Sequence, residues 1–286
     1  MLLERETGGV FWRSSVSGTI RGGPLLREDR VFVATEATPT AHIYALRLSD
    51  GRTAWRTASD GVTAPLVLDG DALFAGTDRG MVLRLATRDG NIVWQRRVFG
   101  GVRAAPVLTA AGLAVATIAD TLYLLDRGTG AILRQRPTPG PVFATPATDG
   151  QRLYLGTLGG VLQAVTLPTL ELAWEVSLPD AIYGAPALAG DTVYALARDG
   201  TLAIVPVACP DERRTLPLGV VSVAGPTVTR SGVLVGTVSG EILLVDPATG
   251  VARWRAQVAG PIENPPLVRE GQLVVVGGLG DIHTYR

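Results

Sequence analysis

Short apolar runs alternate with turn residues along the chain, and none of them keeps a helical period. A typical stretch has an apolar segment that opens on a proline at 65–68, a Gly- and Asp-rich turn at 69–71 and a second apolar run at 72–75. A Gly-Thr-x-x-Gly turn follows at 76–80, and an alternating segment comes next at 82–85. Short apolar or alternating runs between such turns predict β-strands.

This pattern recurs about every 40 residues along the chain. A proline marks each repeat, with spacings of 41, 41, 40, 40, 40 and 40, at Pro24, Pro65, Pro106, Pro146, Pro186, Pro226 and Pro266. Four short strands per repeat are typical of a β-propeller blade. The sequence therefore predicts an all-β fold, a seven-bladed β-propeller of four-stranded blades, as a single domain over residues 1–286. The expected blades are about 17–57, 58–97, 98–137, 138–177, 178–217, 218–257, and 258–286 plus 1–16.

The two ends of the chain resemble parts of one blade. After Pro266 only three strand segments remain, and the N-terminal residues Glu-Thr-Gly-Gly-Val-Phe-Trp at 6–12 look like the missing fourth strand. Pairing the two ends would remove an open sheet edge, which otherwise invites aggregation. We therefore expect residues 9–16 to complete the last blade.

The five tryptophans all occupy one position of the repeat. Each stands four residues after the glycine of the second turn or its equivalent, at Trp12, Trp55, Trp94, Trp174 and Trp254, and Arg134 and Arg214 take this position in two repeats. A flat indole can bury a large area between neighbouring blades while its N–H bonds a backbone group. We interpret the tryptophans as docking residues, with Trp12 closing the last blade and the others docking their own blades.

Charge and composition exclude several classes of partner and site. The 26 basic and 26 acidic residues cancel, so there is no electrostatic footprint for nucleic acid or an anionic membrane. The single cysteine, Cys209, excludes an internal disulfide and a multi-thiolate metal site. The only histidines, His42 and His283, are interpreted as structural or surface residues. We expect no metal site.

Targeting signals leave the location open. The N-terminus has neither the basic stretch nor the long apolar run of a secretory signal, and no stretch approaches 18 consecutive apolar residues. The sequence predicts no membrane insertion. It is compatible with an extracytoplasmic or periplasmic location if a signal or anchor was removed, and with a cytoplasmic one otherwise.

Three segments, at 246–254, 126–130 and 236–240, resemble the tryptophan-docking repeat of pyrroloquinoline-quinone (PQQ) propellers, and the resemblance covers essentially the whole chain. That family includes quinone-dependent dehydrogenases, the lipoprotein scaffold of the machine that inserts outer-membrane β-barrels, and sensor domains fused to bacterial Ser/Thr kinases. The resemblance implies the fold, but the fold does not choose among these functions.

Catalysis is not expected from the residues present. Dehydrogenases that resemble this repeat use a metal with Asp, Glu and Asn ligands, an adjacent-cysteine disulfide and long insertions, whereas Cys209 has no neighbouring cysteine and the repeats are uniform. Phosphate-loop, zinc-protease and nucleophile-elbow motifs are absent from the sequence. We favour a bacterial, non-catalytic binding or scaffold domain without a cofactor. A PQQ-binding kinase sensor and a quinone-dependent oxidoreductase are the alternatives.

The predicted recognition surface is the channel mouth, where the repeats differ. Three residues before each marker proline the sequence has Arg21, Val62, Arg103, Phe143, Tyr183, Val223 and Glu263, and Asn264 is a polar neighbour. These side chains either line a solvated channel and pair with one another, or bind a partner. The candidate binding residues are Arg21, Arg103, Phe143, Tyr183, Glu263 and Asn264. They suit a protein or peptide, or a small planar or acidic ligand, held by charge-assisted hydrogen bonds and stacking on a monomeric domain.

Overall fold

The computed structural model describes residues 1–4, 7–36, 40–278 and 280–285. Within these ranges the chain consists of β-strands, turns and a single short 3₁₀ helix, η1 (Pro210–Glu212). The predicted all-β class is confirmed. The chain divides into two compact units, Met1–Arg136 and Pro137–Arg286. A single domain over residues 1–286 stays a prediction.

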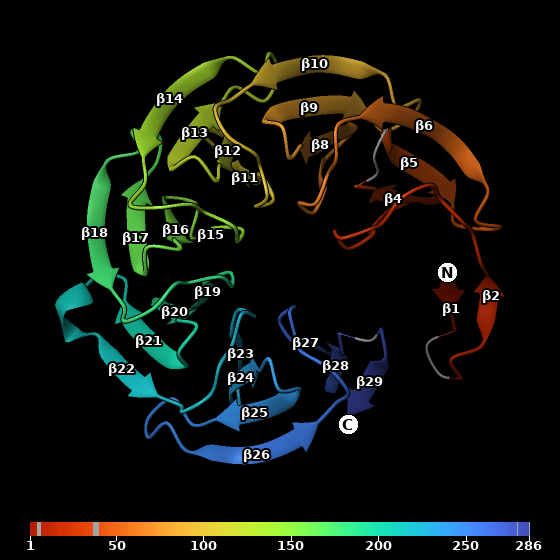
Figure 1. Ribbon diagram of the computed structural model, residues 1–286. Helices are drawn as coiled ribbons and strands as arrows, with labels where there is room; N and C mark the ends of the chain where they lie inside the picture. Colours follow the sequence, from red (N-terminus) through yellow and green to blue (C-terminus); the bar gives the residue numbers. More distant parts are fainter. Residues whose placement is uncertain (5–6, 37–39, 279, 286) are drawn as a thin grey trace. The chain divides into compact units, whose positions relative to one another are not determined.

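The first unit holds a hairpin and three four-stranded sheets whose strands follow chain order (Figure 1). The hairpin pairs β1 (Leu2–Leu3) with β2 (Val10–Trp12). The sheets consist of β3 (Leu25–Arg27), β4 (Arg30–Ala34), β5 (Ala41–Arg47) and β6 (Thr53–Ser59); β7 (Val67–Asp69), β8 (Ala72–Gly76), β9 (Met81–Ala86) and β10 (Ile92–Arg97); and β11 (Val107–Thr109), β12 (Gly112–Ala116), β13 (Thr121–Leu125) and β14 (Ile132–Pro137).

The second unit repeats this arrangement in three further four-stranded sheets and a shorter one. Its sheets consist of β15 (Ala147–Thr148), β16 (Arg152–Gly156), β17 (Val161–Thr166) and β18 (Leu172–Ser177); β19 (Ala187–Ala189), β20 (Thr192–Leu196), β21 (Thr201–Pro206) and β22 (Arg214–Pro217); β23 (Thr227–Thr229), β24 (Gly232–Gly236), β25 (Glu241–Val245) and β26 (Ala252–Gln257); and β27 (Leu267–Arg269), β28 (Gln272–Val276) and β29 (Ile282–Tyr285).

The N-terminal strand β2 lies in a hairpin, and its closure of the last blade stays a prediction. Three strands, β27 to β29, form the last sheet of the described residues, and the structure pairs β2 with β1. Gly8 N donates to Glu4 O at 2.9 Å, and Glu4 N donates to Gly9 O at 2.7 Å, so the chain folds back into this hairpin. The predicted ladder between residues 9–16 and the last blade is not among the strand pairs of the described residues.

A β-bulge precedes each tryptophan and sets its direction. In β6, Trp55 pairs with Ala45 whereas Thr53 pairs with Leu46, so one extra residue stands on the tryptophan strand. The same register shift occurs before Trp12, Trp94, Trp174 and Trp254. A bulge bends the strand and re-aims the next side chain. The repeat therefore needs both the turn glycine and the extra residue to place the indole.

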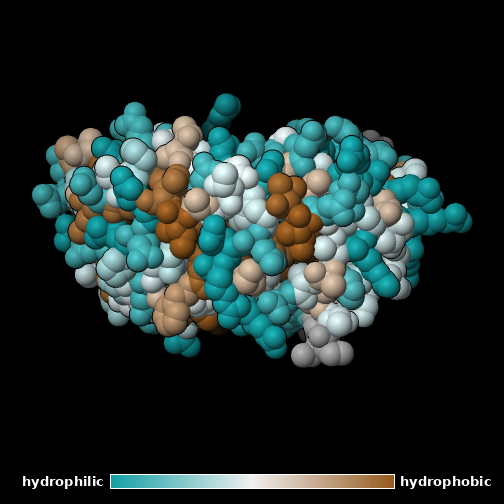
Figure 2. Space-filling view, turned by 90° about the horizontal axis from the view of Figure 1, so that it is seen from above, coloured by the Kyte–Doolittle hydropathy of each residue, from teal (hydrophilic) through white to brown (hydrophobic). Residues whose placement is uncertain are grey.

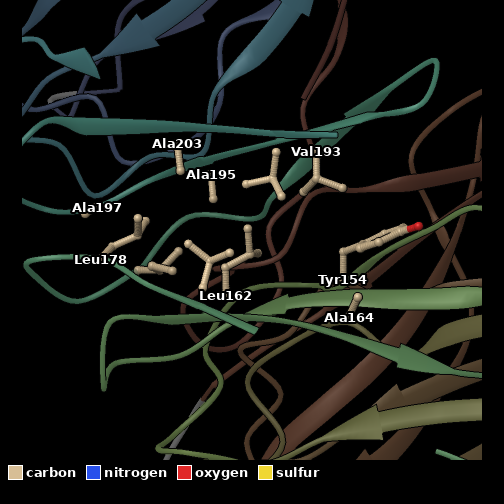
Figure 3. Packing of buried hydrophobic residues seen from close by; sticks show 11 residues of the cluster. Tyr154, Leu162, Ala164, Leu178, Val193, Ala195, Ala197 and Ala203 are labelled. Atoms are coloured by element: carbon tan, nitrogen blue, oxygen red, sulfur yellow. The ribbon is translucent and has the colours of Figure 1, made fainter. Parts of the chain in front are cut away.

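The core lies between consecutive sheets of each unit. In the first unit Phe32 and Ile43 of one sheet share a buried cluster with Leu73 and Leu85 of the next. In the second unit Tyr154, Leu162 and Ala164 face Val193, Ala195 and Ala203 (Figure 3). The small alanines allow a close approach of the sheets, while the larger side chains of the facing sheet fill the space.

The outer strands carry small apolar groups on a largely polar surface. Ile92 and Val93 at the start of β10 are exposed, and Arg96 and Arg97 follow them on the same strand. Figure 2 shows a surface on which apolar groups are small and separated by polar ones. Single apolar side chains on a surface are normal, and charged residues protect an edge strand from pairing. The loops between the sheets are therefore the better candidates for a binding face.

Candidate partner-binding face

The loop that leads into each sheet is fixed by backbone hydrogen bonds to turns of the Thr-x-x-Gly type. In the first unit Val62 N donates to Thr35 O at 3.2 Å, and Asp78 N donates to Gly61 O at 2.8 Å. The second unit has the same bonds at Ile182–Thr157, Arg198–Ala181, Ile262–Thr237 and Val238–Val221. The backbone of these loops therefore repeats, and only their side chains vary.

In three of these loops one side chain is buried against a glycine, which fixes the outward direction of the next. A Cβ atom on Gly76 would lie 2.2 Å from Cγ1 of Val102, so only glycine leaves room for this valine. Ile182 on Gly156 and Ile262 on Gly236 have the same relationship. Arg103, the residue after Val102, is exposed. The residue that follows the buried side chain is the outward position of the loop.

Val62 departs from the prediction. It is 1 % exposed, and its backbone bond to Thr35 makes it the counterpart of Val102 rather than of Arg103. Val62 and Val102 both stand five residues before the first strand of their sheet, but the proline comes one position earlier in the loop of Val62, so counting back three residues from Pro65 gives the buried residue. The outward position of this loop belongs to Thr63.

Charged residues of the first unit pair with each other on this face. Arg21 Nε lies 2.8 Å from Glu36 Oε1, and Arg103 Nε lies 3.5 Å from Asp78 Oδ1. Thr63 Oγ1 donates to the same Asp78 oxygen at 2.6 Å. The side chains of Arg21 and Arg103 are 61 % and 45 % exposed, so these pairs add little to stability. They hold the guanidinium groups in place.

The second unit presents a more apolar set at the same positions. Tyr183 is 38 % exposed and Phe143 is half-buried, while Glu263 and Asn264 are exposed. Val221 and Val238, in the adjoining loop and turn, are also exposed. The shared backbone pattern shows that the candidate residues of each unit stand in equivalent loops. A common channel mouth for all six stays a prediction.

The first variable residue of the Thr-x-x-Gly turn is a second outward position that sequence reasoning missed. In three repeats it is Glu36, Asp78 and Arg198. Its backbone N–H bonds the loop that carries the outward residue, which brings the two side chains to the same face. The signal was available in the sequence, because the charge varies at this position, which follows Thr35, Thr77 or Ala197.

The tryptophans dock onto the sheet that follows their own. Trp12 Nε1 donates to Leu48 O at 2.7 Å, and a Cβ atom on Gly51 would lie 2.5 Å from its ring. The same bond is 2.9, 3.0 and 3.2 Å long for Trp55 to Thr87, Trp94 to Arg127 and Trp174 to Val207. The acceptors lie in the next sheet, although we expected the later tryptophans to dock their own blades.

The described residues contain neither a cluster of possible metal ligands nor a membrane-spanning helix. Among these residues no three His, Cys, Asp or Glu side chains group together as they would around a metal ion. No helix of the described ranges has the length and apolar character needed to span a bilayer. His42 contacts the ring of Tyr44, with ring centroids 5.6 Å apart, and Cys209 is an exposed free thiol.

A family model described as outer membrane protein assembly factor BamB matches residues 1–101, 39–141, 78–208 and 212–285. The chain belongs to this family. The match confirms the resemblance to PQQ-like repeats that the sequence motifs indicated. An outer membrane protein assembly factor BamB of Yersinia pestis is 30 % identical over 105 residues, which cover 32 % of this chain and 26 % of that relative.

Solved structures of related shape support the fold. BamB from Moraxella catarrhalis superposes with a TM-score of 0.82 at 19 % identity, covering 97 % of this chain and 88 % of that one. The computationally designed Ika8 protein gives a TM-score of 0.63 at 14 % identity, covering 96 % and 98 %. The likeness to BamB confirms the β-propeller fold, and the number of blades stays a prediction.

Proposed function

We propose that this chain is a non-catalytic, protein-binding scaffold in outer-membrane protein assembly, and that its partner binds the loops with the variable outward residues. Membership of the BamB family along nearly the whole chain supports the assembly role. The observation that carries the location is the contrast between a repeating loop backbone and non-repeating, exposed side chains on it. Repeat folds build recognition surfaces in this way: the scaffold fixes the conformation of the loops, and the side chains on the loops vary.

A protein partner fits this face better than a small ligand does. Small ligands bind in concave pockets that cover most of their surface. The hollows of about 380 and 330 Å³ in the first unit are lined mainly by residues of its hairpin and first two sheets, among them Arg27, Phe32, Leu25 and Leu46. The six candidate residues do not line either hollow. Our proposal therefore includes no quinone or other cofactor.

The second unit supplies the anchors of the proposed interface. Aromatic side chains in partly buried settings are the residues that most often dominate protein binding. Phe143 and Tyr183 are such residues, and the exposed Val221 and Val238 enlarge the apolar area beside Tyr183. The ion pairs of Arg21 and Arg103 in the first unit would supply polar contacts, which orient a partner more than they tighten its binding. An extended, strand-like polypeptide with apolar side chains fits a face that has apolar anchors in the second unit and charged residues in the first.

We place the protein outside the cytoplasm, at the periplasmic side of the outer membrane. The names of its relatives refer to assembly at that membrane, which is the support for this location. A scaffold of this kind holds a polypeptide and leaves its covalent bonds unchanged. No catalytic residue is assigned.

A binding experiment with a purified, urea-unfolded outer-membrane β-barrel precursor tests the proposal. The double variant Phe143→Ala with Tyr183→Ala should bind the diluted precursor at least about thirtyfold more weakly, since truncation of an interface anchor costs about 2 kcal/mol or more. The variant Phe11→Ala removes an exposed aromatic ring from β2 and serves as the control. Equal binding by the double variant and the wild type, at unchanged Tm, would refute the proposed face.

A quinone titration separates the enzyme and sensor alternatives. Addition of PQQ, with and without calcium, should leave the intrinsic tryptophan fluorescence and a redox dye unchanged. Saturable quenching would identify a sensor instead, and dye reduction would identify an oxidoreductase.

A further inference from the structure

Arg198 occupies an outward turn position that carries acidic residues in two of the three four-stranded sheets of the first unit and Ile118 in the third. The acidic counterparts are Glu36 and Asp78, whose backbone N–H groups donate to Thr19 O and Gly61 O, both at 2.8 Å. Arg198 N donates to Ala181 O at 2.8 Å in the same way. The local geometry is therefore shared, while the sign of the charge is reversed.

The guanidinium of Arg198 differs from those of Arg21 and Arg103 in having no ion pair among the described residues. Its sequence neighbour Asp199 accepts hydrogen bonds from Thr201 N and Oγ1, at 2.9 and 3.0 Å. Asp180, in the loop that bonds Arg198, accepts from Ala181 N at 2.7 Å. The two nearest acidic side chains in the sequence are thus bonded to their own turns.

The backbone of Arg198 joins the two loops that carry the apolar part of the face. Its N–H bonds Ala181, two residues before Tyr183, and its carbonyl accepts from Ser222 N at 3.0 Å. Ser222 follows Val221, whose carbonyl in turn accepts from Val238 N at 2.9 Å. An exposed cation therefore stands between an exposed tyrosine and two exposed valines.

We propose that Arg198 is a recognition residue for a carboxylate of the bound polypeptide, with the apolar neighbours of that carboxylate contacting Tyr183 and Val221. The inference rests on the proposed function and goes beyond it by naming the chemistry of the partner. The planar guanidinium can donate two parallel hydrogen bonds to one carboxylate, which gives orientation as well as affinity. In the first unit Glu36 and Asp78 already fill this role for Arg21 and Arg103.

The partner chemistry is an extended segment in which an acidic residue alternates with apolar ones. Successive side chains of a strand point to opposite sides, so alternate positions face the same surface. Glu263, the outward residue two repeats after Tyr183, has the opposite charge and no ion pair among the described residues. A second acidic side chain near Glu263 is disfavoured, so the acidic residue of the partner is directed to Arg198.

Two blocked synthetic peptides test this inference. Both have the same apolar residues at alternate positions, with aspartate between them in one and lysine in the other. Wild-type protein should bind the aspartate peptide about tenfold more tightly at low salt, as expected for a charge-assisted contact. Arg198→Glu should reverse this preference.

The control variant is Arg230→Glu, which makes the same change in net charge in the turn between β23 and β24, at the other end of its sheet. It should keep the wild-type preference. Equal binding of the two peptides, binding of neither, or equal effects of the two variants would each overturn the role of Arg198. The precursor-binding experiment tests the proposed function independently. If Arg198 has no preference for a carboxylate, the Phe143 and Tyr183 variants would still weaken precursor binding.

Discussion

The indole Nε1 of Trp12 donates to the carbonyl oxygen of Leu48 at 2.7 Å, across 36 residues of sequence. The ring lies against Gly51, so the bond and the contact both join the hairpin to the sheet that follows it. Trp55 and Trp94 repeat this arrangement on Gly90 and Gly130. The docking glycines have positive φ, so they are needed for backbone conformation as well as for space.

Gly90→Ala should lower the free energy of unfolding by about 2–4 kcal/mol, the sum of left-handed strain and overpacking. A Cβ atom there would lie 2.4 Å from Trp55 Cε3 and 2.7 Å from Thr57 Oγ1. Gly70→Ala is the matched control, because Gly70 also has positive φ but nothing lies within 4 Å of the added atom. Urea unfolding followed by circular dichroism measures both. Similar losses in the two variants would show that the indole contact adds nothing.

Substitution of tryptophan by phenylalanine should affect Trp94 more than Trp254. Trp94 Nε1 donates to Arg127 O at 3.0 Å, whereas the Trp254 indole N–H has no hydrogen-bond partner among the described residues and the side chain is 37 % exposed. Trp94→Phe should cost about 1–2 kcal/mol through the lost bond and lost packing, and Trp254→Phe under about 1 kcal/mol. Thermal unfolding compares the two. A larger loss for Trp254 would contradict the importance of the docking bond.

The repeat made most of the fold predictable from the sequence, because strand, turn and tryptophan positions recur at one spacing. The features that the repeat did not predict are local ones. The bulge before Trp55 directs the ring to the next sheet, and a bulge leaves no mark in the hydrophobic pattern. Counting from the proline puts Val62 at the outward position because Pro65 stands one position earlier in a loop of the same length. Arg198 was not predicted because it lies in a turn between strands, and only the backbone bond from Arg198 N to Ala181 O brings that turn to the loop of Tyr183.

Removing the arginines of the first unit should leave stability nearly unchanged. Arg21 and Arg103 are both well exposed, and exposed ion pairs contribute roughly 0–1 kcal/mol. The double variant Arg21→Ala with Arg103→Ala should therefore keep its Tm within a few degrees. If these residues contact the partner, precursor binding weakens at the same time. A large fall in Tm would show instead that the ion pairs serve the fold.

The hydrogen bond from Tyr154 Oη to Asp149 Oδ2, 2.6 Å long, should make stability depend on pH at both ends of the range. Burial of Asp149 acts to raise its pKa, but the tyrosine hydroxyl and the N–H groups of Arg152 and Gln151 lower it further, so the net shift is downward. Burial and the bond to Asp149 raise the pKa of Tyr154 to about 12.

The signs of the two contributions are opposite. Ionised Asp149 stabilises the fold fully above its ordinary pKa of about 3.9, and this contribution is lost as the pH falls through its lower folded value. Protonated Tyr154 stabilises the fold fully below about pH 10, and this contribution is lost as the pH rises through about 12. Tyr154→Phe should cost about 1 kcal/mol at neutral pH and reduce the acid dependence of the urea midpoint. Unchanged acid dependence, or a Tyr154 that ionises near pH 10 in an ultraviolet titration of the folded protein, would contradict this coupling.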